Sequence, residues 1–195
     1  MGSGGRRTSE SGRSESRRVV LGVCGSIAAY KAADLCSKLV QRGDDVSVIM
    51  TRAATQLVGP ITFAALTGRN VATEPWDREG EVYVEHIDLA DRAEVFVVAP
   101  APANFLAKAA AGIADDMLTS TLIAVTCPVV VAPAMNTRMW RHKATVRNVA
   151  AVRELGYEIV EPGSGFLACR DVGEGRLADT SQILERIDAA LARKA

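Results

Sequence analysis

Short, wholly apolar runs rich in valine alternate along this chain with longer segments of helical periodicity. Each run is too short for a buried helix and lies close to glycine or proline, which is typical of a buried strand. Strands that are apolar on both faces and alternate with helices predict a parallel sheet covered by helices on both sides. Five strands are expected, at residues 18–24, 45–50, 95–99, 128–132 and 158–160.

The segments between these strands carry the apolar stripe of helices that pack on a sheet. Helices are expected at residues 27–42, 60–67, 104–111, 116–124, 144–154 and 181–193. We expect Gly43 to follow the end of the first helix, and Thr180 or Ser181 to cap the last. The sequence thus predicts an α/β three-layer sandwich.

Length and composition suit one ordinary globular domain, residues 18–195. Lys plus Arg and Asp plus Glu each number 23, so the net charge gives no indication of a nucleic-acid or membrane partner. No apolar run is long enough to span a bilayer. Residues 1–17 are rich in arginine, serine and glycine and lack an apolar core, which predicts a disordered tail and not a secretory signal.

The chain has four cysteines: Cys24, Cys36, Cys127 and Cys169. They form no CxxC pair and fit neither a zinc site nor a disulfide framework, so we expect no metal and a reduced, cytoplasmic compartment. The first three are expected to be buried and inert. Cys169 differs because it lies beside Arg170 in a glycine-rich stretch, residues 162–175, where a cation would favour the thiolate. Loops of this length inside compact domains are often lids.

Four loops would follow the carboxyl ends of the predicted strands, where ligands bind in parallel sheets. They are residues 25–26, 51–53, 100–104 and 133–140. Gly25-Ser26 ends a strand and opens a helix, so it suits either an anion site or an ordinary tight turn. The GxGxxG fingerprint is missing, and Thr51 stands where an acidic residue would hold an NAD ribose. This favours a mononucleotide phosphate over NAD. Asn104 would cap its helix or bond a flavin edge.

Two polar side chains suit chemistry in this part of the predicted fold. Asn136 lies between Met135 and Met139 in Pro-Ala-Met-Asn-Thr-Arg-Met-Trp (residues 133–140), where its amide could bind a carboxylate beside an apolar wall. A turn asparagine among core methionines is the alternative. His86, in a segment of weak strand or loop character, is a candidate general base because imidazole titrates near neutrality. A buried structural histidine is its alternative.

Taken together, four motifs resemble those of the homo-oligomeric flavin-containing cysteine decarboxylases. They are Gly-Ser-Ile-Ala-Ala-Tyr-Lys at residues 25–31, His-Ile-Asp-Leu at 86–89, the octapeptide at 133–140, and Ala-Cys-x-Asp-x-Gly-x-Gly-Arg at 168–176. The similarity covers about residues 18–193. It implies a flavodoxin-like, Rossmann-like fold, FMN as the cofactor, a small-molecule substrate, and a trimer or dodecamer with active sites shared between protomers.

The same resemblance implies roles for individual residues. FMN contacts are expected from Gly25, Ser26, Ile27, Thr51, Ala53, Pro102, Ala103, Asn104, Phe105 and Ala134. Substrate contacts are expected from Met135, Asn136, Met139, Ala168 and Arg176. Of the catalytic residues, His86 would be the base, Asn136 would hold the substrate carboxylate, and Cys169 would be the proton donor on a flap.

Within the family, the motifs are similar to those of the carboxy-lyases that convert phosphopantothenoylcysteine (PPC) to phosphopantetheine and carbon dioxide in coenzyme A biosynthesis. Cys169 favours this activity over decarboxylation of a peptide C-terminal cysteine, which releases an unreduced enethiol and needs no flap cysteine. His86 and Asn136 argue against a non-catalytic regulatory flavoprotein. Arg170 departs from the glycine that relatives commonly have there. The chain is too short for the synthetase domain fused to many bacterial relatives, so we expect another chain to supply that activity.

Overall fold

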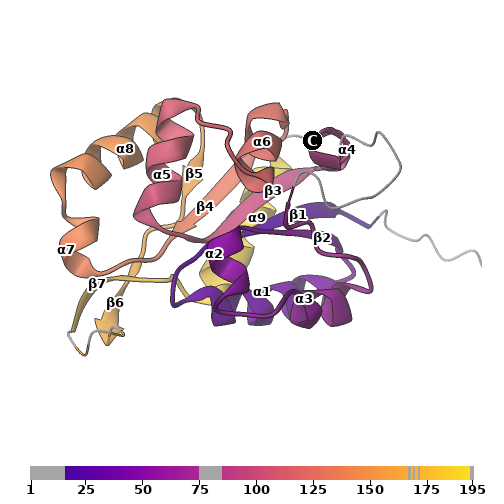
Figure 1. Cartoon of the computed structure of the whole chain (residues 1–195), viewed down its shortest axis with the longest axis horizontal. Helices are drawn as coiled ribbons and strands as arrows, with labels where there is room; N and C mark the ends of the chain where they lie inside the picture. Colours follow the sequence, from indigo (N-terminus) through magenta and orange to yellow (C-terminus); the bar gives the residue numbers. More distant parts are fainter. Residues whose placement is uncertain (1–15, 75–84, 167, 169, 171, 194–195) are drawn as a thin grey trace, which may run out of the picture.

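The computed structural model describes residues 16–74, 85–166, 168, 170 and 172–193. Its main sheet contains parallel strands in the order β2-β1-β3-β4-β5 (Figure 1). These strands are β1 (Arg18–Val23), β2 (Asp45–Met50), β3 (Val95–Ala101), β4 (Val129–Pro133) and β5 (Glu158–Ile159). The order is that of flavodoxin-like folds, so the predicted sheet and fold class are confirmed.

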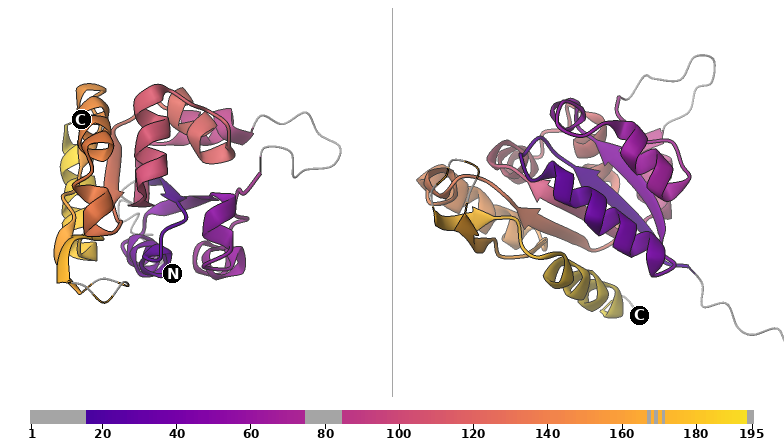
Figure 2. Two further views of the ribbon diagram at one scale, coloured as in Figure 1. Left: turned by 60° about the vertical axis from the view of Figure 1, so that its left-hand side comes forward. Right: turned by 90° about the horizontal axis from the view of Figure 1, so that it is seen from below.

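Helices cover both faces of this sheet (Figures 1 and 2). One face carries α1 (Ala29–Gln41), α2 (Arg52–Thr55), α3 (Pro60–Thr67) and α9 (Thr180–Ala192). The opposite face carries α4 (Glu85–Arg92), α5 (Ala103–Ala111), α6 (Met117–Ala124) and α8 (Lys143–Glu154). A short helix, α7 (Thr137–Trp140), follows β4. No described helix has the length and apolar character needed to cross a membrane.

Each central strand contributes to two hydrophobic cores. In β3, Val95 and Val97 pack into the core that includes α1 and α9, whereas Phe96 and Val98 pack into the core that includes α5 and α6. All four side chains are fully buried. Successive side chains of a strand point to opposite faces, so a strand covered on both sides must be apolar at every position. This requirement produces the continuous apolar runs in the sequence.

The glycine-rich stretch that follows β5 contains an antiparallel pair of strands, β6 (Gly163–Phe166) and β7 (Val172–Arg176). The pair lies beside α7, away from the main sheet (Figure 1). The prediction of a loop for this stretch was therefore wrong. Its strands are mostly glycine and polar residues, which lack the apolar alternation by which half-buried strands are recognised.

Most predicted helix starts differ from the observed ones by one or two residues, and two of these differences change a predicted cap. Asp179, and not Thr180 or Ser181, precedes the last helix, and its N–H donates to the Gln182 side chain at 3.1 Å. The helix after β3 begins at Ala103 with Pro102 as its N-cap residue. Asn104 therefore lies inside the first turn and accepts a hydrogen bond from the N–H of Phe105 at 2.9 Å.

The environment predicted for His86 was also wrong, because this residue lies in a helix, α4. Glu85 and Asp88 stand in the first turn of α4 and Arg92 in its last, an arrangement that complements the helix dipole. Ala90 is buried, and Leu89 packs against the core beneath the helix. These features outweigh the weak strand pattern of the segment.

Three of the four cysteines match their prediction. Cys24, Cys36 and Cys127 are buried, and burial raises the pKa of Cys36 to about 11. Cys169 and residues 1–15 of the predicted tail lie outside the described residues. Arg17 is described, and its guanidinium pairs with Asp44 at 2.6 Å and with Asp188 at 2.8 Å.

Candidate functional site

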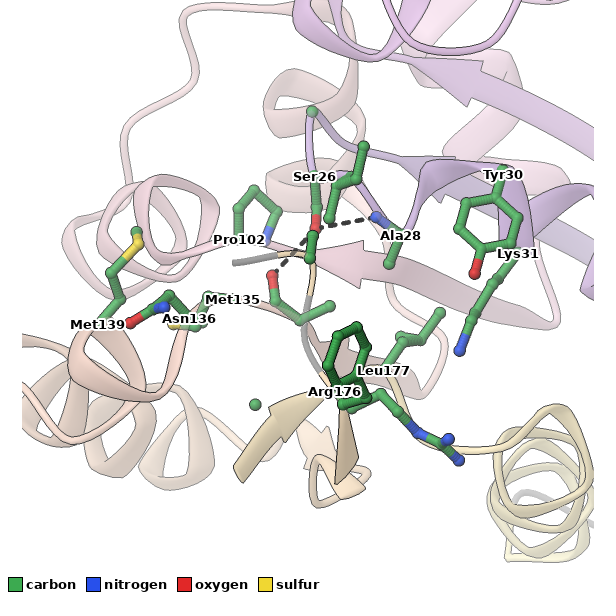
Figure 3. A pocket seen from close by; sticks show the side chains of 16 residues that line it. Ser26, Ala28, Tyr30, Lys31, Pro102, Met135, Asn136, Met139, Arg176 and Leu177 are labelled. Atoms are coloured by element: carbon green, nitrogen blue, oxygen red, sulfur yellow. Dashed lines mark hydrogen bonds between the residues drawn. The ribbon is translucent and has the colours of Figure 1, made fainter. Parts of the chain in front are cut away.

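A cavity of about 620 Å³ lies beyond the carboxyl ends of β1, β3 and β4 (Figure 3). Five of the residues predicted to contact FMN line it: Gly25, Ser26, Ile27, Pro102 and Ala134. All five residues predicted to contact substrate line it as well: Met135, Asn136, Met139, Ala168 and Arg176. The structure thus brings together residues more than 100 positions apart, as the meeting of parallel strand ends predicts.

The remaining residues predicted to contact FMN line two other cavities. Thr51, Ala53, Asn104 and Phe105 line a cavity of about 300 Å³, which shares Gly25 with the larger one. Ala103 lines neither this cavity nor the large one. It faces a separate hollow between α5 and α8.

The Gly25-Ser26 turn is held tightly between neighbouring segments. The Ser26 hydroxyl donates to the carbonyl oxygen of Ala134 at 3.2 Å and accepts from the N–H of Ala28 at 3.4 Å (Figure 3). A Cβ on Gly25 would lie 2.4 Å from the Cβ of Ala53, closer than real contacts allow. Glycine is therefore required because the loops after β1 and β2 approach each other at this point.

Asn136 is fixed by the start of α7. Its side-chain oxygen accepts a hydrogen bond from the N–H of Arg138 at 2.8 Å, which makes Asn136 the N-cap of this helix. The turn role considered as an alternative is therefore real, yet the same side chain also lines the large cavity. Because the oxygen is engaged by the helix, the amide has a defined orientation. It can then serve a ligand as a hydrogen-bond donor.

Strand β7 is anchored to the segment that carries Asn136. The N–H of Met135 donates to the carbonyl of Gly175 at 2.9 Å, and the Thr137 hydroxyl donates to the carbonyl of Glu174 at 2.6 Å. Arg141 pairs with the Glu174 carboxylate at 3.2 Å. Thr137 was not among the predicted site residues. Only the tertiary pairing of α7 with β7 reveals its position.

A charged cluster borders the smaller cavity. Lys108 pairs with Asp115 at 2.6 Å and with Asp116 at 3.0 Å. Burial opposes ionisation of Asp116, but hydrogen bonds from the Thr119 backbone and side chain and from Lys108 prevail and lower its pKa. Asp116 caps α6 through these bonds to Thr119. The cluster is thus internally paired, with one lysine shared by two carboxylates, and it supports the helix, which accounts for it without a ligand.

Two predicted catalytic residues are not placed in the large cavity. His86 lines neither of the two cavities that share Gly25. Its helix, α4, lies at the opposite end of the molecule from α7 and the β6–β7 pair (Figure 1). Cys169 lies outside the described residues, although its neighbour Ala168 lines the cavity. Within the described part of the chain, no three His, Cys, Asp or Glu side chains form a group that could hold a metal ion.

Curated relatives match this chain along most of its length. The coenzyme A biosynthesis bifunctional protein CoaBC of Bacillus subtilis is 49% identical over 169 residues, which cover 87% of this chain. The chain spans only 42% of that protein.

Two solved structures are similar over nearly their whole length. The FMN-dependent cysteine decarboxylase SpaF is 40% identical with a TM-score of 0.79, and the match covers 91% of this chain and 96% of SpaF. A PPC decarboxylase variant complexed with pantothenoylaminoethenethiol is 31% identical with a TM-score of 0.82, covering 93% and 100% of the two chains. The family profile described as Flavoprotein matches residues 7–192. The chain therefore belongs to the Flavoprotein family.

Proposed function

We propose that this chain is a carboxy-lyase that uses FMN to convert PPC to phosphopantetheine and carbon dioxide in coenzyme A biosynthesis. The observation that carries the proposal is that Asn136 and the Gly25-Ser26 turn line one cavity, so that an amide and an anion-binding turn face the same bound molecules. The names of the matched CoaBC protein and of the similar PPC decarboxylase support the substrate class.

FMN fits the two cavities that share Gly25. The larger cavity offers an apolar wall for a flat ring, and the smaller one adds the hydroxyl of Thr51 and the first turn of α5. Gly25 lines both cavities and cannot carry a side chain, because a Cβ there would collide with Ala53. We assign FMN binding to these residues. Bound FMN would supply the reversible two-electron oxidation of the substrate cysteine that makes loss of carbon dioxide feasible.

The roles of this chain's own residues follow from their positions. Asn136 holds the substrate carboxylate through its amide, and because this amide is neutral no fixed cation opposes departure of carbon dioxide. Met135 and Met139 form an adaptable apolar wall that limits water around the reacting group. Cys169, next to the cavity-lining Ala168, donates the proton that completes the product.

We further propose that the active enzyme is a homo-oligomer, a trimer or an assembly of trimers, in which His86 of one protomer completes the site of another. The separation of α4 from the cavity within one chain supports this arrangement (Figure 1). His86 then acts as the base toward the substrate thiol. We also propose a cytoplasmic location, since the free thiols of Cys24 and Cys36 suit a reducing compartment.

Carbon dioxide release tests the proposal. The purified protein, loaded with FMN, is incubated with PPC and with a peptide that ends in cysteine, and both carbon dioxide and thiol products are measured. Turnover of PPC to phosphopantetheine is the expected result. Release of carbon dioxide from the peptide alone would assign the activity to peptide modification. A yellow, FMN-loaded protein that acts on neither compound would fit a regulatory flavoprotein.

A further inference from the structure

Two cationic side chains lie together at one end of the large cavity. Lys31 comes from α1 and Arg176 from β7, and Figure 3 shows both on the side away from Asn136 and Met139. The described residues that line this cavity include these two cations and no carboxylate. This end of the cavity is therefore electropositive, whereas the end that contains Asn136 is neutral.

Lys31 has no counterion among the described residues. No ion pair or hydrogen bond joins its ammonium group to any of them, in contrast with Lys38 of the same helix, which pairs with Asp34 at 2.8 Å. Lys31 as a whole is half-buried, and its side chain lines the cavity. Its ammonium group is therefore available to an anion that binds in the cavity.

The position of Lys31 in its helix also requires an explanation. Lys31 stands in the first turn of α1, which contains no acidic residue. A positive charge there opposes the helix dipole and costs stability, so the fold itself gains nothing from it. A residue that destabilises its own helix, with no compensating contact in the fold, is often a ligand-binding residue.

Arg176 is held in place by the fold, and its hydrogen-bonding capacity is only partly used. One of its terminal nitrogens pairs with Asp179 at 2.6 Å. Its Nε is buried and has no hydrogen-bond partner among the described groups. The other terminal nitrogen forms no hydrogen bond to a described residue and can share an anion with Lys31.

We propose that Lys31, together with Arg176, binds the phosphate monoester of the substrate, and that Lys31 thereby selects phosphorylated substrates over a peptide C-terminus. This inference rests on the proposed function. PPC carries its carboxylate and its phosphate at opposite ends, and the cavity presents an amide at one end and two cations at the other. A peptide that ends in cysteine has no group to match the cations.

The test compares substrates with and without the phosphate. In a Lys31→Met variant, kcat/KM for PPC is expected to fall by about 10- to 100-fold, mostly through KM, which corresponds to loss of one charge-assisted contact. For pantothenoylcysteine, which lacks the phosphate, kcat/KM should change by less than about twofold. Lys31→Arg should restore most of the preference. Lys38→Met is the matched control and should leave both substrates unaffected.

A binding measurement distinguishes whether Lys31 binds the phosphate of the substrate or the phosphate of FMN. The Kd of phosphopantetheine and of pantetheine is followed through the flavin absorbance, and the FMN content of each variant is measured. Weaker binding of phosphopantetheine alone is the expected result. Equal weakening of both ligands, or loss of FMN from Lys31→Met, would overturn the proposal. If the wild-type protein acts on neither PPC nor pantothenoylcysteine, the proposed function itself fails.

Discussion

At the scale of single residues, Asn136 combines a structural and a chemical role. Its oxygen caps α7, and the side chain lines the cavity in which the substrate carboxylate is proposed to bind. Substitution by alanine would remove both roles at once and would not distinguish them. Aspartate separates them, because Asp and Asn are comparable N-caps but a carboxylate cannot donate to another carboxylate.

The Asn136→Asp variant is therefore expected to be as stable as the wild-type protein but to lose most of its activity. The melting temperature should stay within about 2 °C of wild type, since the cap remains. The value of kcat/KM for PPC should fall by about 100-fold or more, because like charges then face each other in the cavity. Calorimetry and carbon dioxide release check the two parts. If the variant retained its activity, Asn136 would not be the residue that binds the substrate carboxylate.

Cys169→Ser separates decarboxylation from the final protonation. If Cys169 donates the last proton, the variant should still release carbon dioxide but accumulate the enethiol, which has two hydrogens fewer than phosphopantetheine. Mass spectrometry of the product measures this difference. The similar PPC decarboxylase variant, complexed with pantothenoylaminoethenethiol, supports this expectation. Full conversion to phosphopantetheine by Cys169→Ser would exclude the assigned role.

At the scale of elements, the β6–β7 pair depends on its contacts with the octapeptide at residues 133–140. Gly175 has a φ of +118°, and a Cβ there would lie 2.2 Å from the carbonyl oxygen of Met135. Its own carbonyl accepts the bond from Met135 at 2.9 Å. Any side chain at Gly175 must therefore push β7 away from the wall of the cavity.

Gly175→Ala is expected to reduce kcat/KM for PPC by about 10-fold or more, because it displaces β7, and to cost about 1–3 kcal/mol of stability through backbone strain. FMN should remain bound, since the proposed FMN contacts lie on other elements. Gly163→Ala is the matched control in β6, where the nearest atoms to a new Cβ lie 3.9 Å away. Similar kinetics for the two variants would show that β7 needs no anchoring for catalysis.

The elements also differ in how far the sequence predicts them. The five parallel strands were predicted because burial on both faces forces a continuous apolar composition. The β6–β7 pair was missed because its glycine and polar residues lack the apolar alternation of a half-buried strand, and only their pairing with each other beside α7 reveals the strands. Site residues at strand ends could be grouped in advance, since these ends meet in space. No role was predicted for the Lys31 side chain, because the sequence does not show which face of α1 points into the cavity.

At the scale of the whole molecule, the order of the strands sets which of the proposed site residues meet within one chain. The loops after β1, β3 and β4 meet at the cavity because these strands are neighbours in the sheet. Helix α4 precedes β3 and lies at the far end of the molecule from α7 (Figure 1). His86, which lies in α4, does not line this cavity, so under the proposed shared site a symmetric neighbour would supply it.

Mixing two inactive variants tests this arrangement. In a homo-oligomer with shared sites, subunits of His86→Ala and of Asn136→Asp should each be inactive alone. When the two are co-expressed in equal amounts, random assembly gives about one quarter of the sites an intact Asn136 from one subunit and an intact His86 from another. Activity should therefore return to about one quarter of wild type per site. If each chain used its own His86, every site would carry one defect and no activity would return, so the outcome decides whether one chain or two form the site.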